Sequence, residues 1–236
     1  RPIETVAAAT TLFDTHVHIT ALTDFRDSVR MARKHGFRYG LLSILYDERP
    51  YGRLFLGDPH LFETMKRYPD VFVGLGLFQM NESGFPGFAR QGPDDASRVE
   101  ALWKQGCKGI KTLEKWSRTN VDDAKFDEAY RRMASLGMPV VFHTNEEGSG
   151  CSCTRVANVA RRHPGLNVVM AHLHDRQQFE AVLPALRELP NLYWQHMHLD
   201  RVKVEGGGSA LEALVRGGLW PKVLFGSDVT NDHTGL

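Results

Sequence analysis

The sequence of 236 residues lacks the features that indicate a membrane protein or a nucleic-acid-binding protein. Its longest apolar runs, such as VFVGLGLF at 71–78, fall well short of the roughly 20 residues that a membrane-spanning helix needs. Lys and Arg number 29 and Asp and Glu 28, and the net charge of +1 is too small to attract nucleic acid or an anionic membrane. We therefore expect neither nucleic acid nor a membrane as a partner. The candidate site, not the charge, leads us to expect a small-molecule substrate, and homo-oligomerisation is left open.

Cysteine is also scarce, at three residues: Cys107, Cys151 and Cys153. The last two form a C-x-C pair that is too close for an easy disulfide, and an odd count suits a reducing compartment. We therefore expect a cytoplasmic location. As an isolated pair, C-x-C is more often incidental than a metal site.

What the sequence does contain is a series of eight short, β-rich apolar runs. They recur at intervals of about 25 to 35 residues, which is the spacing of a strand plus a crossover helix. The predicted strands are 12–19, 39–45, 71–78, 107–113, 139–144, 167–173, 192–198 and 222–228.

Helical patterns separate these runs, and several end on glycine, as at 24–36, 94–106 and 126–139. Alternating strands and helices with near-continuous apolar strands predict a parallel sheet covered by helices. Eight such units indicate an α/β fold, a single (β/α)₈ TIM barrel over 1–236, with an open doubly wound sheet as the alternative. The helix expected after the eighth strand is missing from this sequence, and we favour a natural chain that runs on.

Histidines gather where these predicted strands end. Seven of the eleven lie at or just past a strand end: His16, His18, His143, His172, His174, His196 and His198. Active sites of such barrels lie at the C-terminal ends of the strands. This distribution therefore places ligand-type side chains where barrel enzymes carry out their chemistry.

The first-strand pair, His16 and His18, is two residues apart, so both side chains should project to the same side of the strand. The fifth and sixth strands place His143 and His172 at the same terminal layer, and the eighth ends on Asp228. Imidazole and carboxylate suit zinc, manganese or iron, and an open site with a bound water would be catalytic.

Each of these signals has a structural alternative. An isolated H-x-H motif is weak evidence, a strand-end histidine is usually hydrogen-bonded within the fold, and an Asp after Gly-Ser often caps a turn. The coincidence of four strands at one depth favours the metal site.

The motifs together resemble one known family. His16-Val17-His18, GIK on the fourth strand, His143 after MPVVF, MAH on the sixth strand and LFGSD on the eighth are similar to the metal-dependent amidohydrolase superfamily. The nearest group is the amidohydrolase-related one (amidohydrolase 2), with lactone hydrolases and zinc-dependent aromatic-acid decarboxylases.

The resemblance implies that His16, His18, His143 and Asp228 ligate a divalent metal, most often Zn²⁺ and alternatively Mn²⁺. It also implies that His172 either ligates a second metal or hydrogen-bonds the attacking water and the substrate carbonyl. Lys111 on the fourth strand is either carboxylated and bridges two metals, binds substrate, or supports packing. We expect one ion rather than two.

The chain departs from the family pattern after the sixth strand. Many relatives continue with Leu-Gly-Gly, whereas this sequence reads AHLHD and places His174 near the site. We expect the substrate to contact Lys111, His174, His198, Trp116 and Arg118. Other loop residues that could hold an acidic or ring-containing substrate are Tyr46, Arg49, Tyr51, Arg53 and Lys115. Strand parity leaves open whether His196 and His198 contact substrate or face outward.

The leading function is a metal-dependent hydrolase in which activated water cleaves an amide, ester or lactone of a small, acidic substrate. Asp228 would accept the proton of the water and pass it to the leaving group, and His172 would orient the water or polarise the carbonyl. The alternatives are a non-oxidative decarboxylase of an aromatic or unsaturated acid with the same ligands, and a catalytically silent metal-binding barrel.

Overall fold

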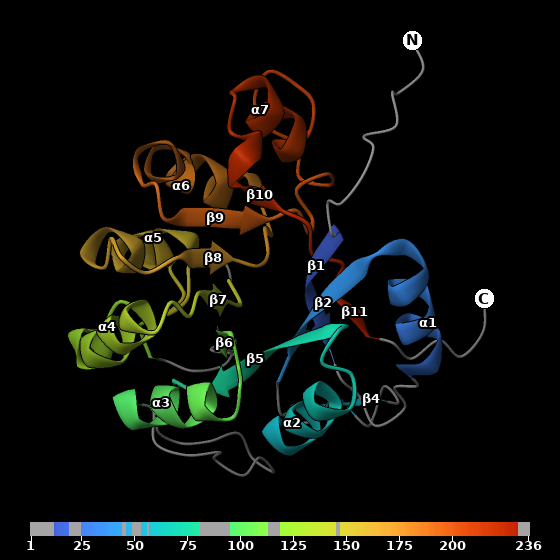
Figure 1. Ribbon diagram of the computed structural model, residues 1–236. Coiled ribbons are helices and arrows are strands. Elements are labelled where there is room, and N and C mark those ends of the chain that lie inside the picture. The colour runs from blue at the N-terminus through green and yellow to red at the C-terminus, as the bar shows by residue number, and fades with distance from the viewer. Residues whose placement is uncertain are drawn as a thin grey trace.

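The computed structural model describes residues 12–18, 25–43, 46–48, 53–55, 57–80, 95–112, 119–144 and 147–230. Its core is a parallel sheet that curves into a nearly closed barrel (Figure 1). The sheet contains β1 (Leu12–His18), β2 (Phe37–Leu42), β5 (Phe72–Phe78), β6 (Gly109–Thr112), β7 (Val140–Phe142), β8 (Val168–Met170), β9 (Leu192–Gln195), β10 (Val223–Leu224) and β11 (Val229–Thr230). The fold is the expected (β/α)₈ barrel, with eight strand positions.

The eighth strand position closes the ring in two pieces. β10 pairs with β9, and β11 pairs with β1, both in parallel. Between them the backbone continues along β1, because Thr15 N donates to Phe225 O at 2.9 Å and Asp228 N donates to His16 O at 2.9 Å. An open doubly wound sheet would leave β1 and the eighth strand unconnected, so this pairing excludes it.

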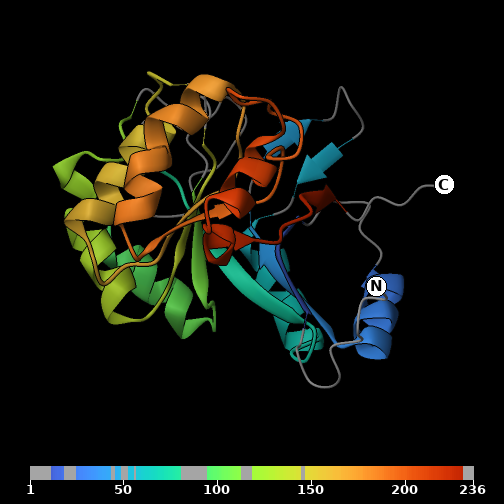
Figure 2. The same ribbon diagram turned by 90° about the horizontal axis from the view of Figure 1, so that it is seen from above.

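Helices cover the outside of the sheet (Figures 1 and 2). They are α1 (Phe25–His35), α2 (Asp58–Arg67), α3 (Ala96–Lys104), α4 (Asp127–Ser135), α5 (Cys153–Arg162), α6 (Arg176–Glu188) and α7 (Ala210–Arg216). Side chains cap several of their N-termini: Asp95 accepts from two backbone N–H groups of α3, and Ser209 forms a capping box with Glu212 on α7. These caps satisfy backbone groups that would otherwise have no partner within the helix.

Two features were not predicted from the sequence. One is α2, which lies along the chain between the second and third strand positions of the barrel. The other is a small antiparallel hairpin, β3 (Tyr46–Glu48) and β4 (Arg53–Phe55), which follows the C-terminal end of β2. The strand expected at 222–228 as one run is also divided, with residues 225–228 between β10 and β11.

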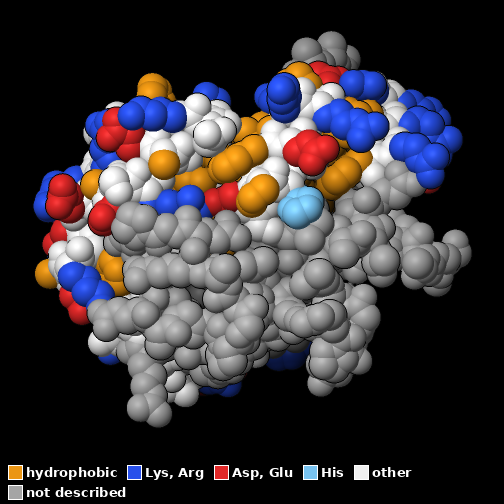
Figure 3. Space-filling view, turned by 90° about the horizontal axis from the view of Figure 1, so that it is seen from below, with side chains coloured by type: hydrophobic (Ala, Val, Ile, Leu, Met, Phe, Trp, Pro, Cys, Tyr) orange, Lys and Arg blue, Asp and Glu red, His pale blue; other side chains and the backbone are white. Residues whose placement is uncertain are grey.

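The core has two parts. The larger packs the helices against the outer face of the sheet, and a smaller cluster fills part of the barrel interior: Leu42, Leu75, Val141, Val169, Ala171 and Met197. On the surface, Lys and Arg side chains gather on the side that carries α1, and both signs of charge occur elsewhere (Figure 3). In the described part of the chain, no helix is both long and apolar enough to cross a membrane.

Candidate metal centre

The first strand supplies two buried imidazoles to one point. His16 is 0% and His18 6% exposed, and their Nε2 atoms lie 3.0 Å apart. The register of β1 against β2 shifts between Asp14 and Val17, so an irregularity in the strand lies at this pair. Such irregularities commonly re-aim a side chain next to an active site.

Asp228 reaches the same point from the segment between β10 and β11. Its Oδ1 lies 2.9 Å from His18 Nε2 and 3.3 Å from His16 Nε2. Its backbone is left-handed, with φ of +56°, which is unusual for a residue other than glycine. Asp14 ties this segment to β1, because its Oδ1 accepts from His16 N at 3.1 Å and from Ser227 N at 3.0 Å.

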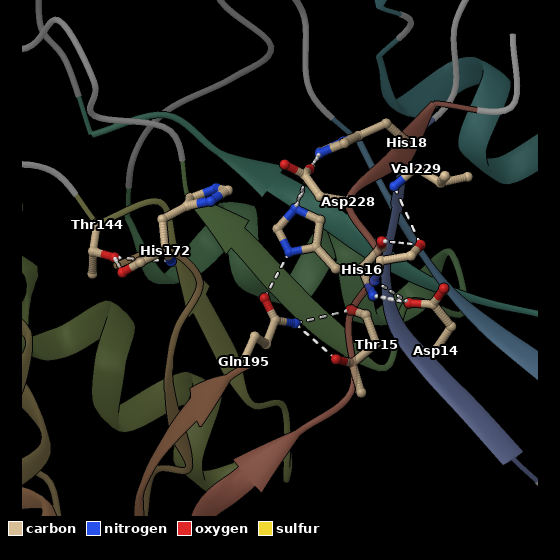
Figure 4. Close-up of polar contacts among 10 residues, drawn as sticks. Asp14, Thr15, His16, His18, Thr144, His172, Gln195, Asp228 and Val229 are labelled. Atoms are coloured by element: carbon tan, nitrogen blue, oxygen red, sulfur yellow. Dashed lines mark hydrogen bonds and ion pairs between the residues drawn. The ribbon is translucent and has the colours of Figure 1, made fainter. Parts of the chain in front are cut away.

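The orientation of His16 follows from a chain of hydrogen bonds (Figure 4). Thr15 Oγ1 donates to Phe225 O at 2.6 Å, and Gln195 Nε2 donates to Thr15 Oγ1 at 2.8 Å and Thr15 O at 3.2 Å. Gln195 Oε1 must then face His16 Nδ1, at 2.6 Å. Since that oxygen can only accept, Nδ1 carries the proton and the lone pair of a neutral ring lies on Nε2, toward His18 and Asp228.

His172 adds a fourth group from the loop after β8. One ligand atom each from His16, His172 and Asp228 lies within 4.8 Å of the other two. Thr144 Oγ1 donates to His172 O at 2.6 Å, and Trp194 Nε1 donates to the same oxygen at 3.3 Å. His172 Nε2 is buried and has no hydrogen-bond partner among the described residues, so a polar atom with an unmet requirement faces the cluster.

The environment keeps the two imidazoles neutral and the carboxylate charged. Burial, together with the charge of Lys111, lowers the pKa of His16 well below its ordinary value and that of His172 to about 3. For Asp228, burial alone would raise the pKa, but the hydrogen bond with His18 and the electrostatic interaction with the adjacent His18 and His16 rings outweigh it and hold the pKa well below its usual range. Neutral imidazoles and a carboxylate are the protonation states that bind cations.

The spacing of these atoms suits a metal ion. Bond lengths of about 2.0–2.2 Å place adjacent ligand atoms of a tetrahedral or octahedral ion about 2.8–3.6 Å apart. The distances among His16 Nε2, His18 Nε2 and Asp228 Oδ1 are 3.0, 2.9 and 3.3 Å. The residues present therefore fit a divalent metal, with His172 next to it.

Comparison with known proteins identifies the family of the chain. The Amidohydrolase family model matches residues 13–234. The chain belongs to the amidohydrolase family. No curated protein gives a significant match to the sequence. As a superfamily of enzymes, amidohydrolases include hydrolases and decarboxylases and usually bind a divalent metal.

Solved structures of similar fold share little sequence with this amidohydrolase. An uncharacterized TIM-barrel protein from Bordetella bronchiseptica aligns over 87% of this chain and 70% of its own, with 15% identity and a TM-score of 0.62. A probable 2-pyrone-4,6-dicarboxylic acid hydrolase from Acinetobacter baumannii, with citric acid bound, aligns over 94% and 85%, with 14% identity and 0.63. A 5-carboxyvanillate decarboxylase from Novosphingobium aromaticivorans, with manganese bound, aligns over 90% and 72%, with 14% identity and 0.52.

Other residues expected at the site of this amidohydrolase lie around His172. The ring of His143, a proposed ligand, lies 4.2 Å between centroids from that of His172, which itself belongs to the compact group described above. The rings of His198 and His174 are 5.6 and 6.1 Å from His172. Lys111 is fully buried on β6, close enough for its charge to affect His16 and His172.

The structure separates the two histidines of the seventh strand position. His198 has a left-handed backbone, φ +65°, and its ring faces His172 and His174. His196 instead stacks on Phe225, with centroids 4.9 Å apart. Of the other expected substrate contacts, Trp116 and Arg118 lie outside the described residues, as do Arg49, Tyr51 and Lys115.

Sequence reasoning did not identify the residues that support these groups. Gln195 orients His16, Asp14 holds the segment before Asp228, and Thr144 holds His172 through its backbone and accepts a hydrogen bond to its own carbonyl from His174 Nε2 at 2.9 Å. The sequence did contain one signal for Gln195 and Thr144, namely their positions at the ends of predicted strands. Amide and hydroxyl side chains are too common there to be singled out without the fold.

Proposed function

We propose that this amidohydrolase is a metal-dependent hydrolase that cleaves an amide, ester or lactone bond of a small substrate with an activated water. The observation that carries the proposal is the convergence of His16 Nε2, His18 Nε2 and Asp228 Oδ1 within 3.3 Å at the C-terminal end of the barrel. In TIM barrels this end is where chemistry occurs.

When bound, a divalent ion would supply Lewis-acid activation of water and of the scissile carbonyl. His16, His18 and Asp228 would hold it, with His143 and His172 as the candidates for further ligation. Asp228 remains ionised because its pKa is lowered, so its carboxylate is available to accept the proton of the attacking water and donate it to the leaving group. Neutral His172, with its unsatisfied Nε2, would orient that water or the carbonyl.

Two further observations support this assignment. The family match covers nearly the whole chain, and the bound species in similar folds are citric acid in the Acinetobacter baumannii hydrolase and manganese in the decarboxylase. His16 and His18 lie on β1, and His16 has behind it the orienting hydrogen-bond chain that is usual for a metal-ligating histidine. We expect one ion, Zn²⁺ or Mn²⁺.

The decisive experiment uses the protein loaded with Zn²⁺ or Mn²⁺ and a panel of lactones, esters and amides followed by proton release. Asp228→Asn should lower the hydrolytic rate by at least about a hundredfold while metal analysis still finds the ion. Asp200→Asn is the matched control, because Asp200 is an exposed aspartate in the turn beyond His198. Equal rates for Asp228→Asn and the parent protein would refute the role of Asp228.

The same ligands would also serve a decarboxylase, and one structural neighbour is a 5-carboxyvanillate decarboxylase. In that reaction the carbon–carbon bond to the carboxylate breaks, carbon dioxide leaves, and a proton takes its place on the substrate carbon. Aromatic and unsaturated carboxylic acids therefore belong in the panel. Carbon dioxide release without hydrolysis would establish the lyase, and bound metal with no turnover of any substrate would indicate a silent barrel.

A further inference from the structure

A cavity lies below the histidine cluster, inside the barrel. Its volume is about 310 Å³, and apolar side chains of the strands form most of its wall: Phe13, Val73, Leu75, Val141, Val169 and Leu224. Lys108, Pro139 and Asn167 also line it, and each directly precedes a strand, β6, β7 and β8 respectively. The cavity therefore lies toward the N-terminal ends of the strands, away from the metal centre.

The inner end of the cavity has few hydrogen-bonding groups left for water. Thr15 and Gln195 form it, but Gln195 is already bonded to Thr15 and His16, and the Thr15 hydroxyl donates to Phe225 O. The cavity has room for about ten waters at roughly 30 Å³ each, yet a buried water needs two to four polar partners. Displacing such weakly held water with an apolar group is favourable.

The outer end offers donors. Lys108 and Asn167 are exposed, and neither side chain makes a hydrogen bond or ion pair within the described part of the chain. Lys222 lies near the cavity, with its Nζ 5.0 Å from the ring centroid of Tyr193. Its ammonium group already donates to Leu189 O and Pro190 O at 2.7 Å, unlike that of Lys108. No Asp or Glu is among the described residues that line the cavity. An ammonium and an amide beside an apolar hollow complement a carboxylate with an apolar body.

We propose that this cavity is a second ligand site, which binds an apolar-bodied monocarboxylate such as a medium-chain or aromatic acid. The apolar body occupies the barrel interior between Val141 and Val169, and the carboxylate lies at Lys108 and Asn167. Because Gln195 separates the cavity from His16, a bound acid contacts the support of the metal centre without touching the metal ligands. The proposal is independent of the reaction catalysed at the other end.

The test is calorimetric titration of the metal-loaded protein with octanoate. We expect saturable binding with one site in the cavity, and no such binding of acetate, which has a carboxylate but no apolar body. Lys108→Gln should weaken octanoate binding about three- to tenfold, and 1-octanol should bind the parent protein about as well as octanoate binds Lys108→Gln. Lys203→Gln, an exposed lysine beyond β9, is the matched control and should leave binding unchanged.

Val169→Phe should weaken octanoate binding by occupying part of the space for its apolar body, with circular dichroism and metal content used to show that the variant folds. Lys108 is exposed, so its variant keeps the test valid even if Val169→Phe does not fold. Equal octanoate affinity in the parent, Lys108→Gln and folded Val169→Phe proteins would place the acid outside the cavity and overturn the proposal. Absence of saturable octanoate binding would overturn it as well.

Discussion

The two ends of this barrel are packed differently, although the same strands form both. At the C-terminal end, polar side chains are buried and held by specific bonds, as His16 is by Gln195 at 2.6 Å. At the N-terminal end, apolar side chains line a cavity of about 310 Å³. One end is ordered by hydrogen bonds that fix direction, whereas the other depends on non-directional contacts and leaves space. The difference indicates that directional hydrogen bonds are concentrated around the proposed metal centre.

The largest effect that we expect from this contrast is a loss of folding stability at low pH. His16 and His172 have lowered pKa values, so below about pH 6.5 the unfolded chain binds protons that the folded chain excludes, for His172 down to about pH 3. Metal-free protein should therefore lose stability as the pH falls through this window, by about 1.4 kcal/mol per pH unit for each histidine. Because the pKa of Asp228 is lowered in the folded protein, its contribution to the stability of the fold is lost only at a pH below that at which an ordinary Asp is protonated.

Urea unfolding of chelator-treated protein from pH 7 to 4 measures this effect. In His172→Asn the slope should be shallower, since one of the two excluded protonation sites is gone. A control, His60→Asn on the exposed start of α2, should keep the parent slope. If stability is independent of pH over this range in the parent protein, the two imidazoles are not held neutral by the fold.

A smaller effect is expected from the bond that orients His16. Gln195→Leu keeps the size of the side chain but removes the acceptor of the Nδ1 proton, so the ring loses its fixed tautomer. Loss of such a supporting bond commonly lowers metal affinity or activity by about 10- to 100-fold. We expect a loss of metal affinity of this size in Gln195→Leu. Competition with a metallochromic chelator measures it.

Gln105→Leu, on the last turn beyond α3, is the control for Gln195→Leu and should bind metal as the parent does. Equal metal affinity of Gln195→Leu and the parent would show that the packing of β1, rather than the hydrogen-bond chain, positions His16.

The smallest effect concerns the apolar end. Val141→Ile adds a methylene group into the cavity and should raise the free energy of unfolding by up to about 0.8 kcal/mol. The same change at Val156, which is 0% exposed in the packed core of α5, should instead destabilise by roughly 1–3 kcal/mol through overcrowding. Urea unfolding compares the two. Similar losses in both variants would mean that the cavity closes in solution.

The eight strands could be predicted from the sequence because each is a short apolar run separated from the next by helix-length spacing. The sequence also led us to expect His16, His18, His143, His172 and Asp228 at one end, since parallel strands end on one face of a barrel. The structure groups His16, His172 and Asp228 most tightly and places the ring of His143 beside that of His172. Gln195 could not be predicted, because its bond to His16 spans 179 residues and the adjacent His196 and His198 are the more conspicuous residues. The divided eighth strand depends on the left-handed Asp228, which sequence pattern does not reveal.

The closing seam of the barrel has a consequence for how the chain is tied together. His18 and Asp228 are 210 residues apart, and they meet where the first strand adjoins the last. Gly226 is required at this seam, because a Cβ there would lie 2.9 Å from His16 Cβ. An ion shared by His18 and Asp228 would act as a cross-link that closes almost the entire chain into one loop. Its removal should therefore release the seam first, so hydrogen exchange at the backbone amides of Thr15 and Asp228 would report metal loss.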